Sequence, residues 1–146
     1  MNSLTYVHRW MTGLLDDWII GLMVDHLDPE TIRRYPAKAE TWFVAPHLTA
    51  LHLQELGVPT NRVVRLDVGE TRTLGGVEVR GVFALPTGAD VLDTTGYLLR
   101  FANGRSVYHT SDTAFHPLVL AAAPREPDVM LVRVLSAKPE VSPNDK

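Results

Sequence analysis

Apolar and polar positions follow two different periods along this chain, and the change falls near Gly57. Before it, between Leu4 and Val24, apolar residues recur at the spacing of one helix face. They are Val7, Trp10, Met11, Leu14, Leu15, Trp18 and Leu22. This spacing predicts an amphipathic helix that packs on the core or on a partner. A membrane-surface helix is the alternative, but Asp16 and Asp17 would lie on its polar face, which carries little basic charge.

Two further helices and one buried strand are predicted in the next thirty or so residues. Asp28 can accept a hydrogen bond from a free backbone amide, and Pro29 suits a first helical position, so a helix starts here and stops before Pro36. Thr41–Ala45 is rich in aromatic and β-branched residues, which is typical of a short buried strand. The segment Pro46–Leu56 predicts a second helix, ended by the glycine that follows it.

From there the period changes to two, which predicts consecutive strands. These strands are Arg62–Leu66, Glu70–Leu74, Val77–Ala84, Gly96–Phe101 and Arg105–Thr110. Gly75-Gly76 and Asn103-Gly104 are strong hairpin signals. A short helix from Pro117 to Ala123 and one more strand, Asp128–Val134, complete the pattern. The order predicts an α/β (α+β) layered domain with mostly antiparallel strands.

Composition narrows the classes of function. The chain has 146 residues, which suits one domain, and its net charge of −3 gives no electrostatic footprint for nucleic acid. It has no cysteine, so disulfides and thiolate metal ligands are excluded, and any zinc would need His, Asp or Glu. The apolar run Trp18–Val24 is far shorter than the roughly 20 residues of a membrane span and has no signal-peptide features. We therefore predict a cytosolic protein with neither a membrane nor a nucleic-acid partner.

Four stretches, in this order, carry a family resemblance: VDHLDPET, FVAPHLTALHLQELGVPTNRVVRLDVGETRTLGGVEVRGV, TTGYLLRF and VYHTSDTAFHP. Together they resemble the metallo-β-lactamase-fold hydrolases, and most closely the ascorbate-6-phosphate-lactonase-like branch. The resemblance runs from Asp25 to Val134. It implies a partial α-β-β-α sandwich with divalent metals at one edge between the sheets, where a lactone, ester, amide or phosphodiester would be hydrolysed.

The same resemblance implies the metal ligands. Asp25 and His26 match the last two residues of the family's His-x-His-x-Asp-His loop, whereas Gly21 and Met23 stand where its first two histidines belong. Asp112 matches the bridging aspartate of a His-Ser-Gly-Asp-like segment. The implied metal site is therefore Asp25, His26 and Asp112, with Asp25 as the catalytic residue. Such a site would hold at most one Zn or Mn ion.

Each of these residues also has a structural interpretation. Asp25 and Asp28 can cap a helix or form a turn, His26 can be a satisfied polar residue at a layer edge, and Asp112 lies in a turn-forming Thr-Ser-Asp-Thr sequence. His47 and His52 are off the spacing of a helical metal pair and are predicted to be surface or packing residues. Nucleophilic alternatives are weaker: without cysteine a thiol nucleophile is impossible, and although Ser106 and Ser111 flank His109, the chain has no Gly-x-Ser-x-Gly elbow. It has no phosphate-binding glycine loop either.

The predicted organisation has three parts: an N-terminal amphipathic helix over 1–24 in place of the family's first strands, a metallo-β-lactamase-like core over 25–135, and a flexible tail over 136–146. The predicted function is metal-dependent hydrolysis of a small-molecule substrate. The alternative is a non-catalytic remnant, or a binding or oligomerising domain of that fold. Because a shortened sheet exposes unpaired strand edges, we also predict a homo-oligomer.

Overall fold

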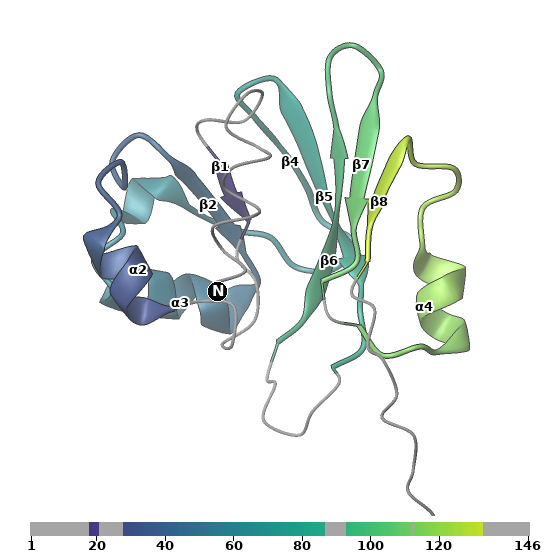
Figure 1. Ribbon diagram of the computed structural model, residues 1–146, viewed down its shortest axis with the longest axis horizontal. Coiled ribbons are helices and arrows are strands. Elements are labelled where there is room, and N and C mark those ends of the chain that lie inside the picture. Colours follow the sequence, from purple (N-terminus) through teal and green to yellow (C-terminus); the bar gives the residue numbers. More distant parts are fainter. Residues whose placement is uncertain (1–17, 21–27, 87–92, 112, 133–146) are drawn as a thin grey trace, which may run out of the picture.

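The computed structural model describes residues 18–20, 28–86, 93–111 and 113–132. Its strands are β1 (Trp18–Ile20), β2 (Trp42–Ala45), β3 (Val63–Arg65), β4 (Thr71–Leu74), β5 (Val77–Phe83), β6 (Thr95–Arg100), β7 (Ser106–His109) and β8 (Val129–Leu131). Its helices are α2 (Pro29–Arg34), α3 (His47–Glu55) and α4 (Pro117–Ala122), with one 3-10 turn, η1 (Thr60–Arg62). Figure 1 shows two sheets between α2 and α3 on one side and α4 on the other, which is the predicted layered α/β arrangement.

The first sheet is parallel, in the order β1-β2-β3, and it corrects one prediction. Trp18, Ile19 and Ile20 pair with β2 along its length, so the helix predicted over Leu4–Val24 is wrong for these residues. One aromatic and two β-branched side chains suit a strand, and a neighbouring strand supplies a complete ladder of backbone bonds. The rest of the predicted helix lies outside the described residues.

The strand β3 corrects a second prediction, which placed Arg62–Leu66 among the antiparallel strands. It pairs parallel with β2 instead. Val63 packs against the helical layer and Val64 packs against the second sheet. A strand covered on both faces is typical of a parallel sheet. The hydrophobic period of such a short apolar run does not show whether the strand pairs parallel or antiparallel.

The second sheet has the order β4-β5-β6-β7-β8. Its first four strands are antiparallel, and the predicted hairpins at Gly75-Gly76 and Asn103-Gly104 are confirmed between β4 and β5 and between β6 and β7. Gly104 has φ +81°, which the hairpin turn requires. The strand β8 joins β7 in parallel at one edge, after α4 has crossed back over the sheet.

The helices begin where the sequence predicts. Asp28 caps α2 by accepting hydrogen bonds from the Thr31 backbone N–H at 3.2 Å and its hydroxyl at 2.5 Å. The Thr31 hydroxyl is the main cause that lowers the pKa of Asp28. His116 caps α4, because its Nδ1 accepts from the Leu118 N–H at 3.1 Å. Within the described ranges no helix exceeds the nine residues of α3, and none has the length and hydropathy of a membrane span. The cytosolic location stays a prediction.

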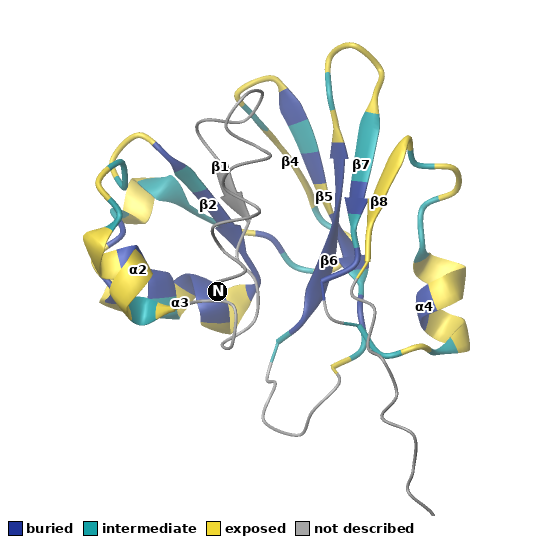
Figure 2. Cartoon of the chain, in the orientation of Figure 1, coloured by how far each residue is buried: buried dark blue, intermediate teal, exposed yellow. Residues whose placement is uncertain are grey.

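Successive side chains of β2 point to opposite faces of the first sheet, so this strand packs against both neighbouring layers. Phe43 and Ala45 face α2 and α3, where they pack with Ile32, Ala50 and Leu53. Val44 faces the opposite way, into a cluster with Leu66, Val77, Val79, Tyr97 and Leu99 from the second sheet and its approach. Figure 2 shows these buried positions concentrated along β2, β5 and β6, whereas β8 is exposed throughout. The core therefore lies on both sides of β2, under the helices and between the sheets, and thins toward β8.

Candidate functional site

The ends of several strands meet at one edge of the sandwich. β1, β2 and β3 run parallel, so their carboxyl ends lie together. In the second sheet, the pairs Phe83–Thr95 and Tyr97–His109 bring the carboxyl ends of β5 and β7 to the start of β6. Asp93, just before β6, bonds to the start of α3, just after β2. We call this shared edge the Asp93 edge; it lies toward the lower part of Figure 1.

Asp93 itself caps α3 from the other sheet. Its carboxylate accepts from the Leu48 N–H at 2.6 Å, the Thr49 N–H at 3.3 Å and the Thr49 hydroxyl at 3.0 Å. The residue at the usual capping position is Pro46, which makes no side-chain cap. An acidic group favours a helix N-terminus because the first amides are unpaired and the helix dipole is positive there. Asp93 is therefore committed to holding the two sheets together.

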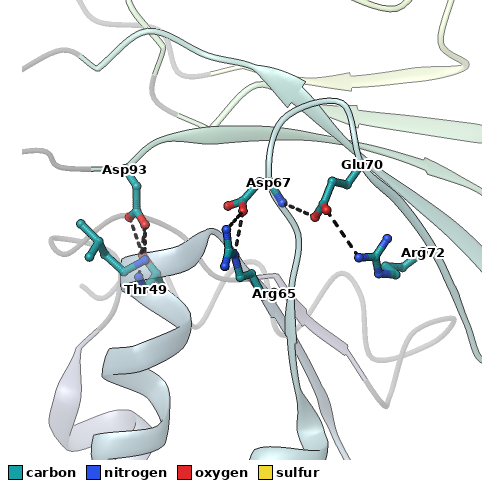
Figure 3. Close-up of polar contacts among 7 residues, drawn as sticks. Thr49, Arg65, Asp67, Glu70, Arg72 and Asp93 are labelled. Carbon is teal, nitrogen blue, oxygen red and sulfur yellow. Dashed lines mark hydrogen bonds and ion pairs between the residues drawn. The ribbon is translucent and has the colours of Figure 1, made fainter.

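The other carboxylates along this edge are also paired (Figure 3). Asp67 forms an ion pair with Arg65 and accepts its Nε–H at 2.7 Å. Glu70 accepts from the Asp67 backbone N–H at 3.0 Å and lies 3.5 Å from Arg72. These pairs neutralise the acidic groups and fix the turn between β3 and β4. Within the described ranges, no three His, Asp or Glu side chains are grouped so that they could hold a metal ion.

Two buried hydroxyls lie at the start of β6. Tyr97 is fully buried and Thr94 is 8% exposed, and neither hydroxyl has a hydrogen-bond partner among the described residues. Burial, followed by the negative charges of Asp93 and Asp67, raises the pKa of Tyr97. The phenol is therefore protonated at neutral pH and can donate a hydrogen bond. A buried polar group without a partner costs free energy, so each hydroxyl marks a place where a polar partner would be favourable.

The segment after β7 has an unusual backbone. Ser111 has φ +59°, a left-handed conformation that glycine adopts more easily, and it stands at the glycine position of the His-Ser-Gly-Asp-like pattern. Its N–H donates to His109 Nδ1 at 3.0 Å, which places the proton of a neutral His109 on Nε2. Thr110 and Ser111 are buried. A strained backbone held in a buried turn is often found at functional sites.

The chain that follows this turn is tied to the end of β5. The Leu85 N–H donates to the Thr113 hydroxyl at 2.8 Å, and the Ala114 N–H donates to the Leu85 carbonyl at 2.8 Å. The predicted ligands Asp25, His26 and Asp112 lie outside the described residues. What the structure gives for them is the position of the strands that precede them: β1 and β7 both end at the Asp93 edge.

Comparison with known proteins identifies the family. The profile of the beta-lactamase superfamily domain matches residues 20–142, which is most of the chain. The chain belongs to the beta-lactamase superfamily. The match confirms the superfamily that the sequence resembles, whereas the lactonase-like branch stays a prediction. No curated protein sequence gives a significant match.

Solved structures of this fold agree. A possible metal-dependent hydrolase from Veillonella parvula superposes with a TM-score of 0.59 at 17% identity, over 77% of this chain and 46% of that one. The isothiocyanate hydrolase from Delia radicum gut bacteria gives 0.61 at 13% identity, over 78% and 47%. CmlA, a diiron β-hydroxylase from Streptomyces venezuelae, gives 0.57 at 27% identity, over 69% and 21%. The chain thus spans less than half the length of these neighbours, and the predicted partial α-β-β-α fold is confirmed.

Sequence reasoning missed two residues of this edge. Asp93 lies in a stretch with no periodic signal, and its partner amides are 44 and 45 residues away in the chain. Tyr97 looks like an ordinary strand residue, because nothing local shows that its hydroxyl ends between two sheets. The sequence did contain a signal for the unusual backbone of His109–Ser111, because Ser111 stands where the family pattern has glycine.

Proposed function

We propose that this chain binds one divalent metal ion at the Asp93 edge and acts there as a hydrolase. The ligands in this proposal are Asp25, His26 and Asp112. The observation that carries it is the topology: Asp25 and His26 follow the end of β1 by at most six residues, and Asp112 follows the end of β7 by three. Because both strands end at the same edge, short connections suffice to bring the three side chains together.

The chemistry of these donors fits one ion. One imidazole and two carboxylates suit Zn, Mn or Fe, and a catalytic site of the zinc type needs only three protein ligands. A second ion would lack donors, since Gly21 has no side chain and the Met23 thioether is a poor ligand for these metals. The described carboxylates at this edge do not replace the missing donors, because they are engaged with α3 and with arginines.

When bound, the ion would polarise the carbonyl or phosphoryl oxygen of a small lactone, ester or phosphodiester. In this proposal Asp25 is the catalytic carboxylate: it would accept a proton from the water that attacks the substrate, and the leaving alcohol oxygen would take up that proton. The Tyr97 hydroxyl, which is buried near the charges of Asp93 and Asp67 and has no partner among the described residues, is an available hydrogen-bond donor near the same edge. The paired Asp67 and Glu70 keep their arginines beside the site and limit its net negative charge.

The alternative is a non-catalytic domain of this fold that binds a ligand or a partner. The observation that favours it is the replacement of two loop histidines by Gly21 and Met23. The neighbours show that one fold serves different reactions, since they include a possible metal-dependent hydrolase and a diiron β-hydroxylase. Fold alone therefore does not decide between the two functions.

The first test is whether the protein binds a metal ion and through which residues. Protein purified without chelators is analysed for metal content and titrated calorimetrically with Mn²⁺, Zn²⁺ and Fe²⁺. We expect one ion per chain in the unmodified protein, loss of binding in His26→Ala, and unchanged binding in His52→Ala. His52 is the matched control, because it lies on α3 and pairs with Glu55 at 3.1 Å. Unmodified protein that binds no ion, or equal binding by both variants, would reject the ligand assignment.

Hydrolysis is tested on the metal-loaded protein with a panel of lactones, esters and phosphodiesters. We expect turnover of at least one class that is lost in Asp25→Asn and kept in His52→Ala. Binding of one ion without turnover of any substrate class would reject the hydrolase and favour the binding domain.

A further inference from the structure

The β8 edge of the second sheet carries a large exposed apolar surface. All of β8 is exposed, and so is the outer side of α4 with the chain before it. The exposed residues are Phe115 (85%), Leu118 (62%), Leu120 (59%), Val129 (48%), Met130 (50%), Leu131 (42%) and Val132 (53%). We call this set the β8 surface. Taking roughly 200 Å² as the full accessible area of a large apolar residue, it presents roughly 800 Å². These side chains lie on both faces of the sheet: Met130 is on the side of Tyr108 and α4, whereas Val129 and Leu131 are on the opposite side with Val107. Exposed apolar side chains on both faces of an edge strand favour its pairing with another strand.

The strand edge offers backbone groups as well as side chains. On its inner side, the Leu131 carbonyl accepts from the Thr110 N–H at 3.0 Å. Because backbone groups point to alternate sides along a strand, the N–H and C=O of Met130 point to the open side. In the part of the chain that the structure describes, β8 has β7 as its one neighbour. The sequence 129–132 contains neither charge nor proline, which are the usual features that protect an edge strand.

We propose that a second copy of this chain covers the β8 surface, with the two β8 strands paired antiparallel about a two-fold axis. A two-fold axis requires each copy to present the same patch, and an edge strand with free backbone groups is complementary to its own copy. Strand pairing also covers the exposed β8 side chains, because each strand places its side chains beside those of its neighbour on both faces of the sheet. The pairing joins the second sheets of the two copies into one continuous sheet. This dimer does not depend on the proposed metal site.

The direction in which the backbone N–H and C=O groups point restricts which residues of the two β8 strands can lie opposite each other. Residues directly opposite in an antiparallel pair both point their backbone groups toward the partner or both point them away. The two-fold axis therefore passes through Met130 or through Leu131, and not between them. In either case one residue faces its own copy, with Cβ atoms about 4.5–5.5 Å apart.

Association is tested by light scattering coupled to size-exclusion chromatography over a range of concentrations. We expect a dimer for the unmodified chain and a monomer, with dissociation about a hundredfold easier, for Leu131→Lys, because each lysine would stand within the paired strands, opposite either its own copy or Val129 of the other chain. The matched control is Leu51→Lys, which changes a leucine of similar exposure, 46% against 42%, on α3. An unmodified chain that is monomeric throughout, or a Leu131→Lys variant that stays dimeric, overturns the proposal.

Cross-linking covers the case in which Leu131→Lys does not fold. The chain has no cysteine, so Met130→Cys and Leu131→Cys each carry a single thiol. On mild oxidation we expect one of them to give a covalent dimer at dilute concentration, and Leu51→Cys to give none. Failure of both β8 variants to cross-link, or equal cross-linking by Leu51→Cys, overturns the proposed pairing even if the chain dimerises.

Discussion

Gly81 is the position where a single added methyl group should test how the two sheets meet. It lies in the middle of β5, opposite Tyr97, and the chain leaving β3 passes directly over it. A Cβ built there would overlap the Asp67 carbonyl oxygen and lie 3.0 Å from the carbonyl carbon and 3.3 Å from Val68 Cα. These are backbone atoms, so no side-chain rotation can relieve the contact. Gly81→Ala must therefore push the Asp67 turn away from β5.

The expected cost has two parts. Overpacking against backbone costs about 1–3 kcal/mol. The displaced turn also strains two hydrogen bonds. The Gly69 N–H donates to the Gly81 carbonyl at 2.9 Å, and the Gly81 N–H donates to the Glu70 carbonyl at 3.0 Å. Each bond contributes about 1 kcal/mol to stability. We expect Gly81→Ala to lower the free energy of unfolding by about 3 kcal/mol, which for a chain of this size lowers Tm by roughly 10 °C.

Urea and thermal unfolding followed by circular dichroism measure this loss. Gly104→Ala is the control, because Gly104 has φ +81° with open space around it, so an alanine there is strained by its backbone alone. That strain costs about 1–2 kcal/mol. If Gly81→Ala is no more destabilising than Gly104→Ala, the close approach of the Asp67 turn to β5 is not a real constraint, and our description of the edge is wrong.

Three further predictions concern side chains around the same layers. Asp93→Ala should cost about 1–2 kcal/mol in urea unfolding through loss of the α3 cap, and Asp93→Asn, which keeps an acceptor oxygen, should cost less; equal losses would argue against capping. Ser111→Gly should raise the free energy of unfolding by about 1 kcal/mol by relieving its φ of +59°, and a loss would contradict the strain. The Ser106 amide and then its hydroxyl lower the pKa of Asp128 in the folded chain, so this stabilisation is present above the unfolded pKa of about 3.9 and is lost as pH falls through the lower folded value. Tm measured from pH 6 to pH 2 should therefore fall less steeply for Asp128→Asn, and parallel curves would refute the linkage.

Most of the fold could be predicted because its signals are local. Asp28 with Pro29, and Gly57 after a run of leucines, fix helix ends through capping and backbone conformation. The hairpins follow from paired glycine or Asn-Gly turns. The errors fall on β1 and β3, whose short apolar runs are parallel strands. Parallel pairing depends on segments distant in the sequence, and periodicity carries no information about the partner.

The site could be predicted less completely, for a related reason. The resemblance supplies Asp25, His26 and Asp112 as candidates, and these stay predictions because they lie outside the described residues. The topology adds that the strands before them share an edge. Asp93 and Tyr97 can be found only from the three-dimensional structure. Asp93 caps a helix in a different layer, and the Tyr97 hydroxyl is notable because it has no hydrogen-bond partner among the described residues.

The long-range cap on α3 has a consequence for how the molecule folds. The first turn of this helix lacks a local capping side chain, and the group that satisfies it arrives from 44 residues further along, beside a strand of the other sheet. A nascent helix would therefore fray at its start until β6 has assembled. We expect the two layers to form in one concerted kinetic step, without a populated half-built intermediate, so a fragment that ends before Asp93 should gain little helical structure in isolation.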